Sequence, residues 1–151
     1  MKHYLLFAGL ISLIYACSGN NSGNKETPAN NDTVKAYDAK KGVGKFTHID
    51  LNPSLDKNLA DSGMTIYGLK CASCHKLTDE KMVGPGWKGV TKRREPEWIM
   101  NFVTNTKEML NKDTSAQAML EICLVEMPNQ NLSDQDARKV LEFMRQNDGV
   151  K

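Results

Sequence analysis

Apolar residues recur at helical spacing in four segments of this chain, and polar segments separate them. The first segment begins at residue 55 or 56 and ends at residue 70, the second begins near residue 95, the third covers residues 113–125, and the last follows Ser133. Each segment places its apolar residues on one face, as amphipathic helices do. These apolar residues are Ala60, Gly63, Ile66 and Tyr67; Trp98, Ile99, Phe102 and Val103; Ala116, Met119, Leu120, Cys123 and Leu124; and Ala137, Val140, Leu141 and Met144.

The first and last of these helices are expected to pack against each other. Gly63 is unfavourable inside a helix, which indicates that another backbone approaches closely there. Ser133 is suited to cap the last helix, and Asp136 occupies the capping-box position. We expect the apolar face of the last helix to meet the face that carries Gly63 and Tyr67.

The beginning of the chain has a different pattern. Residues 4–16 form an apolar run after Lys2, which is too short for a comfortable membrane span and is typical of a signal peptide. The run ends in Ile14-Tyr15-Ala16-Cys17, which resembles a bacterial lipobox, where cleavage precedes the cysteine and its thiol is acylated. We therefore expect a lipoprotein signal peptide at residues 1–16 and a lipid anchor at Cys17. The alternative is an ordinary secretory signal with a free Cys17.

Residues 17–45 are expected to form a flexible linker, because residues 18–33 are almost entirely polar and cannot bury enough apolar surface to become ordered. Residues 46–151 are expected to form one domain, and the loose alternation in residues 45–51 suits a short extended segment over it. The net charge of +2 gives no indication of nucleic-acid binding.

The chemistry of the chain is concentrated in Cys71-Ala72-Ser73-Cys74-His75. In an exported protein this C-x-x-C-H spacing indicates covalent haem attachment. The Cys71 and Cys74 thiols would add to the haem vinyl groups, and His75 would bind the iron. A structural zinc site formed by these three residues with Cys123 or His48 is an alternative, but export and the missing second Cys/His pair argue against it. We interpret Cys123 as a small core residue.

The segment after this motif contains Gly84-Pro85-Gly86-Trp87. Metal-bound histidines usually donate their second ring N–H to a carbonyl. Pro85 is a rigid support for such a carbonyl, although the segment also suits a plain turn. Trp87 is expected to contact the porphyrin edge, to donate its N–H to a haem propionate, or to belong to the core.

These residues together resemble class I c-type cytochromes. The matching pieces are Gly63, Ile66-Tyr67, the C-x-x-C-H motif, Gly84-Pro85, Gly89-Val90 and the Met127-Pro128 pair before the last helix. The resemblance covers residues 58–146. It implies a small all-α fold of about four helices around one covalent haem c, in which the N- and C-terminal helices cross and the haem edge is exposed. It also implies that the Pro85 carbonyl binds the His75 ring.

A second axial ligand is needed if the iron binds no substrate. The candidates are His48, Met64, Met82, Met100, Met109, Met119, Met127 and Met144. The resemblance implies Met127, since the family places its methionine ligand in the loop before the last helix. The alternative is that Met127 only packs on the porphyrin. A His/Met pair raises the reduction potential.

We expect a monomeric electron-transfer protein on the periplasmic side of a bacterial membrane, either inner or outer. Its partners would be a quinol-oxidising complex or another donor and a terminal reductase or oxidase. Two stretches, around Cys71-Cys74 and Met127-Pro128, are similar to small cytochromes that accompany nitrous-oxide reductase. No enzymatic activity is expected, because no acid pair stands out. The alternative is a haem-based gas or ligand sensor whose distal ligand is labile.

Basic residues are concentrated around the C-x-x-C-H motif. They form either a collar that steers an acidic partner or an ordinary solvated surface. The last three in the sequence are alternatively suited to bind the haem propionates. The residues concerned are Lys70, Lys76, Lys81, Lys92, Arg93 and Arg94.

Overall fold

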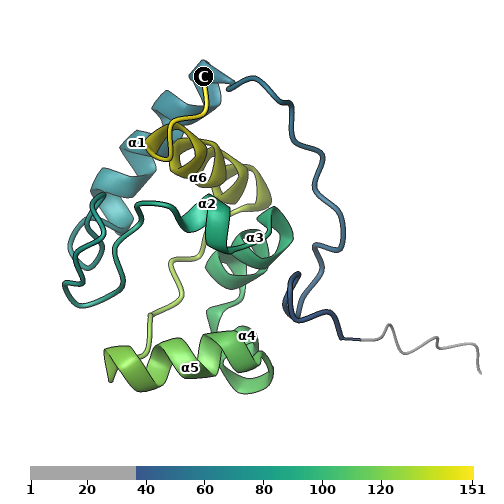
Figure 1. Ribbon diagram of the computed structural model, residues 1–151, viewed down its shortest axis with the longest axis vertical. Helices are drawn as coiled ribbons and strands as arrows, with labels where there is room; N and C mark the ends of the chain where they lie inside the picture. The colour runs from purple at the N-terminus through teal and green to yellow at the C-terminus, as the bar shows by residue number, and fades with distance from the viewer. Residues whose placement is uncertain (1–36) are drawn as a thin grey trace, which may run out of the picture. The chain divides into compact units, whose positions relative to one another are not determined.

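Six helices and the loops between them make up the part of the chain that the computed structural model describes, residues 37–151 (Figure 1). This part contains no strand, and an isolated bridge joins Asp38 to Gly42. The expected all-α fold is therefore confirmed. The helices are α1 (Lys57–Lys70), α2 (Val90–Arg93), α3 (Pro96–Thr104), α4 (Thr106–Lys112), α5 (Thr114–Cys123) and α6 (Asp134–Asn147).

The expected signal peptide at residues 1–16, the anchor at Cys17 and the linker as far as residue 36 lie outside the described residues. Within residues 37–151, no helix combines the length and the apolar character that crossing a membrane requires.

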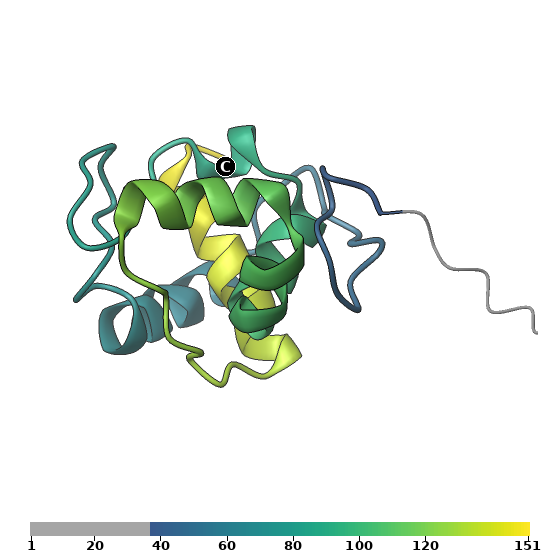
Figure 2. The same ribbon diagram turned by 90° about the horizontal axis from the view of Figure 1, so that it is seen from below.

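Helices α1 and α6 cross at Gly63, as the sequence predicts (Figures 1 and 2). A Cβ atom added at Gly63 would lie 2.8 Å from the Cβ of Phe143 and closer still to the carbonyl of Lys139. The rings of Tyr67 and Phe143 extend this contact, with centroids 5.4 Å apart. The Ser133 hydroxyl caps α6 by accepting from the amide of Asp136 at 3.1 Å.

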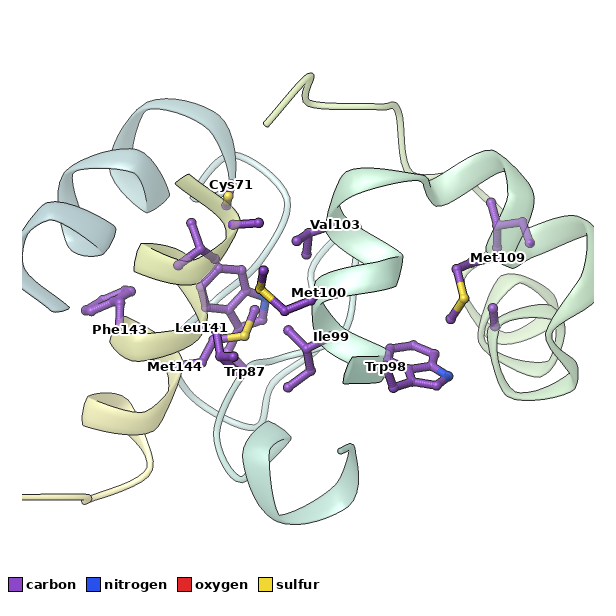
Figure 3. Close-up of a cluster of buried hydrophobic side chains, with 14 residues drawn as sticks. Cys71, Trp87, Trp98, Ile99, Met100, Val103, Met109, Leu141, Phe143 and Met144 are labelled. Atoms are coloured by element: carbon purple, nitrogen blue, oxygen red, sulfur yellow. The ribbon is translucent and has the colours of Figure 1, made fainter. Parts of the chain in front are cut away.

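Helix α3 packs against α6 and contributes the other half of the core. Figure 3 shows Ile99, Met100 and Val103 of α3 facing Leu141 and Met144 of α6, with Trp87 between the two helices. On the other side of α3, Trp98 of α3 lies near Met109 of α4. The two groups of side chains bury both sides of α3, which fixes it between α6 and α4.

The segment before α1 packs against the domain from Tyr37 onward. The Tyr37 hydroxyl donates to the buried Asp113 carboxylate at 2.7 Å, and the amide of Val43 contacts Met109 Sδ at 3.1 Å. The side chain of Asn101 donates to the carbonyls of Lys41, at 3.0 Å, and Phe46, at 2.9 Å. Residues 37–45, which the sequence analysis places in the linker, therefore lie against the folded domain.

Two short helices and one helix end differ from the sequence expectations. Helices α2 and α4 were not expected, and α5 ends at Cys123 instead of continuing to residue 125. Leu124 ends α5 because it adopts the left-handed conformation, with φ of 58°. Its side chain is 84% exposed, so it does not belong to the apolar face to which its spacing assigned it.

Candidate haem-binding site

The C-x-x-C-H motif forms a tight turn that continues directly from α1. The amides of Cys71 and Ala72 both donate to the Tyr67 carbonyl at 2.9 Å, and those of Cys74 and His75 donate to the Cys71 carbonyl at 3.0 Å. Cys71 is buried, Cys74 is half-buried, and both thiols are free. Burial raises the pKa of Cys71 to about 11, so its thiol is protonated at neutral pH in the chain alone.

The His75 ring is oriented by the segment that follows it. Its Nδ1 lies 2.8 Å from the Pro85 carbonyl, to which an N–H at this position donates. Burial lowers the pKa of His75 even though the Pro85 hydrogen bond opposes the shift, which favours a neutral ring at neutral pH. With its proton on Nδ1, the ring keeps a lone pair on Nε2 for a metal.

Gly84 packs against the His75 ring. A Cβ atom at Gly84 would lie 2.7 Å from Nδ1 and 2.9 Å from Nε2 of that ring. On the neighbouring side the Trp87 ring lies 5.8 Å from the His75 ring, centroid to centroid, and the Tyr67 hydroxyl donates to the His75 carbonyl at 2.7 Å. Gly84 and Tyr67 thus help to position His75, although the sequence analysis gave them no such role.

Two adjoining hollows meet at His75. They measure about 580 Å³ and 730 Å³ when the adjoining open solvent is included, and both are lined by His75, Pro85, Phe102, Met119 and Met127. The first also contacts Cys74, Val83, Cys123 and Val125, whereas the second contacts Trp87, Ile99, Met144 and two arginines, Arg93 and Arg94.

This lining fits a large apolar ring system with a charged end. The thiol of Cys74 lies at one hollow, the arginines lie at the other, and the shared walls are largely apolar. Arg93 donates to the Lys88 carbonyl at 2.6 Å, and the Arg94 guanidinium lies 4.4 Å from the Trp98 ring centroid. A haem attached through Cys71 and Cys74 would fit this lining. Its ring is apolar like the shared walls, and its negatively charged propionates would pair with Arg93 and Arg94.

The structure reduces the candidates for the second axial ligand. Met119 and Met127 line both hollows, and Met144 lines the second. The remaining candidates line neither hollow. Of these, Met100 and Met109 are buried in the core, Met64 and Met82 are exposed, and His48 is exposed and bound to Asp50 at 2.9 Å.

Cys123, which we interpreted from its spacing as a small core residue, is not part of the buried core. Its side chain is half-buried at the first hollow, together with Cys74. Over residues 37–151, no three His, Cys, Asp or Glu side chains gather into a group that could hold a metal ion. The zinc alternative therefore has no ligand set in this part of the chain.

A family model and several solved structures of known proteins match this chain. The family model described as "Cytochrome c" matches residues 60–148. The solved structure of a cytochrome c from Rhodothermus marinus is 33% identical, covers 73% of this chain and 92% of its own, and superposes with a TM-score of 0.67. No curated protein sequence matches the chain.

Engineered forms of the Rhodothermus marinus protein are also similar. One is 32% identical, with a TM-score of 0.66, and covers 73% of this chain and 93% of its own. Another, also 32% identical and with the same coverage, superposes with a TM-score of 0.63 and is described as bound to a carbene intermediate.

Proposed function

Because this chain belongs to the cytochrome c family and is a haem c electron-transfer protein, we propose that it is a single-haem carrier with His/Met ligation. Cys71 and Cys74 attach the haem, and His75 and Met127 are its axial ligands. The observation that carries this assignment is that His75, held by the Pro85 carbonyl, and Met127 both line the two hollows. Met119 lines them too, but Met127 lies in the loop directly before α6, which is the position implied by the resemblance to class I cytochromes.

The bound haem supplies an iron that exchanges one electron between its ferric and ferrous states. The chain's own residues decide how that exchange proceeds. His75 and Met127 fill both axial positions, so no position is left for a substrate, and we therefore propose a carrier and not an enzyme. The thioether of Met127 favours the ferrous state and raises the reduction potential, and the apolar walls exclude water.

Electrons would enter and leave at the mouth of the first hollow. Val83 and Val125 line this hollow and are at least 40% exposed, and so are the apolar side chains beside them in the sequence, Met82, Ile122 and Leu124. A hydrogen bond of 2.8 Å from Lys81 Nζ to the Ile122 carbonyl joins the two segments to which they belong. Such a surface suits brief docking of a redox partner.

The partners follow from the expected export of the chain. We propose that it connects a quinol-oxidising complex or another donor with a terminal reductase or oxidase, nitrous-oxide reductase being one candidate. We also propose that a lipid on Cys17 holds it at the periplasmic side of a membrane. The signal-peptide and lipobox patterns of residues 1–17 support this placement.

The ligand assignment is tested by the optical spectrum of the ferric, haem-loaded protein. We expect a far-red band from the Met–iron bond that Met127→Ala removes. Met119→Ala is the matched control, because Met119 also lines both hollows, and it should retain the band. Loss of the band in Met119→Ala with its retention in Met127→Ala would assign the ligand to α5 instead.

A further inference from the structure

Residues 124–132, which connect α5 to α6, carry Met127 and have few hydrogen bonds to the rest of the molecule. Two of their bonds lie within the segment, from Gln130 Nε2 to the Pro128 carbonyl at 3.2 Å and from the Asn131 amide to Asn129 Oδ1 at 2.8 Å. A third is the helical bond that ends α5, from Leu124 to Leu120. These local bonds shape the segment but do not attach it to the half of the domain that holds His75.

Two lysines from that half reach across to it. Lys70 Nζ donates to the Gln130 carbonyl at 3.0 Å, and Lys81 Nζ donates to the Ile122 carbonyl at 2.8 Å. Among residues 37–151, the Lys70 bond is the one hydrogen bond that ties residues 124–132 to a distant part of the chain. The two acceptors lie on either side of Met127 in the sequence.

Both lysines belong to the segments on either side of His75, the other proposed ligand of the iron. Lys70 is the last residue of α1 and directly precedes Cys71, and Lys81 lies in the loop between His75 and Gly84. Figure 2 shows that loop beside the C-terminal end of α5, and the connection from α5 to α6 starts at the same end. The two bonds therefore join the part of the domain that holds His75 to the part that carries Met127.

Lys81 also donates to a carbonyl that its own helix leaves without a partner. Ile122 lies in the last turn of α5, so its carbonyl has no partner within the helix. A cation at a helix C-terminus is favoured by the helix dipole, and a charged donor forms a stronger hydrogen bond than a neutral one. Lys81 thus stabilises the end of α5, where Leu124 holds a left-handed conformation.

We propose that Lys70 and Lys81 are positioning residues that clamp residues 122–130 at both ends and keep Met127 against the iron. The proposal rests on the assignment of Met127 as the axial ligand. It gives two of the six basic residues near the haem motif a role inside the molecule. Lys76, between them in the sequence, instead forms an ion pair with Glu80 at 2.5 Å.

The test uses the ferric, haem-loaded full-length protein and imidazole as a competing ligand at neutral pH. Lys70→Met and Lys81→Met should each raise imidazole affinity about threefold and together about tenfold, since each removes one hydrogen bond that restrains Met127. Lys76→Met is the matched control, because it removes a nearby positive charge without losing a bond to the distal segment. Lys70→Arg and Lys81→Arg retain a charged donor and should bind imidazole like the parent.

The outcomes separate this proposal from the one on which it rests. If the parent shows the Met–iron band and both methionine variants bind imidazole like Lys76→Met, the clamp is refuted and the ligand assignment stands. If the band is absent from the parent, or survives in Met127→Ala, both proposals are refuted together.

Discussion

His75 is fixed by contacts on several sides, and each contact comes from a nearby residue. The Pro85 carbonyl orients Nδ1, Gly84 packs against the ring, and the Tyr67 hydroxyl holds the backbone carbonyl. If His75 binds the iron as we propose, its ring must be held within a narrow range of orientation, and these contacts supply that restraint. Gly84 is the most constrained of them because any side chain there would meet the ring.

Gly84→Ala tests this constraint. The added Cβ would displace the His75 ring, and we expect a loss of about 1–3 kcal/mol in the unfolding free energy of the haem-loaded protein, with an altered ferric spectrum. Gly68→Ala is the control, because a Cβ at Gly68 meets no atom within 4 Å. Alanine is favoured over glycine inside a helix, so this variant should raise the unfolding free energy by about 1 kcal/mol. Denaturant unfolding measures both effects. An alanine at position 84 that changes neither stability nor spectrum would contradict the account.

Local spacing was sufficient to predict the haem motif and Pro85 as candidates, because Cys71, Cys74 and His75 lie within one turn of backbone. The same reasoning left eight candidates for the second ligand. Only the tertiary structure shows that Met119 and Met127 line both hollows while Met100 and Met109 are enclosed in the core. Helical spacing places a methionine on an apolar face but does not reveal whether that face borders a cavity.

At the scale of the elements, α6 is tied to the segment before α1 through a buried carboxylate. Glu142 is 0% exposed, and its Oε1 accepts from the Asp56 amide at 2.9 Å and from Arg145 at 2.7 Å, while Oε2 accepts from Arg138 at 2.5 Å. Burial alone would raise the pKa of Glu142, but these three donors hold it below its usual range. The ionised carboxylate therefore stabilises the folded state above the unfolded pKa of about 4.3.

Glu142→Gln should lower the unfolding free energy by about 3 kcal/mol at pH 7, because it leaves the buried Arg145 and the partly buried Arg138 without a charged acceptor. The difference from the parent should shrink as the pH falls below about 4 and through the lowered pKa, where the parent's own carboxylate becomes protonated. Denaturant unfolding as a function of pH measures this. Glu121→Gln, at an exposed position on α5, should change stability by less than about 0.5 kcal/mol. A deficit in Glu142→Gln that grows on acidification would contradict the assignment.

The four longer helices followed from apolar periodicity, whereas α2, α4 and the N-terminal segment did not. Helix α2 has four residues and α4 seven, which is too short for a period to emerge. Residues 37–45 are ordered by Asn101 and Asp113, which lie far along the sequence. Such pairings between distant side chains and backbone leave no local pattern in the sequence.

At the scale of the whole molecule, the described domain surrounds two adjoining hollows with the haem motif on one side and the Met127 segment on the other. The crossing of α1 and α6 supports the first side, and α3, α4 and α5 support the second. The Lys70 and Lys81 bonds join the two sides. An electron carrier needs this arrangement to stay closed around the iron in both oxidation states.

Addition of carbon monoxide to the reduced, haem-loaded protein tests that claim most directly, with the optical spectrum as the readout. If His75 and Met127 occupy both axial positions, the parent spectrum should not change, whereas Met127→Ala should bind carbon monoxide. A parent protein that binds carbon monoxide readily would have an open iron position, which would contradict the carrier assignment and favour a ligand sensor.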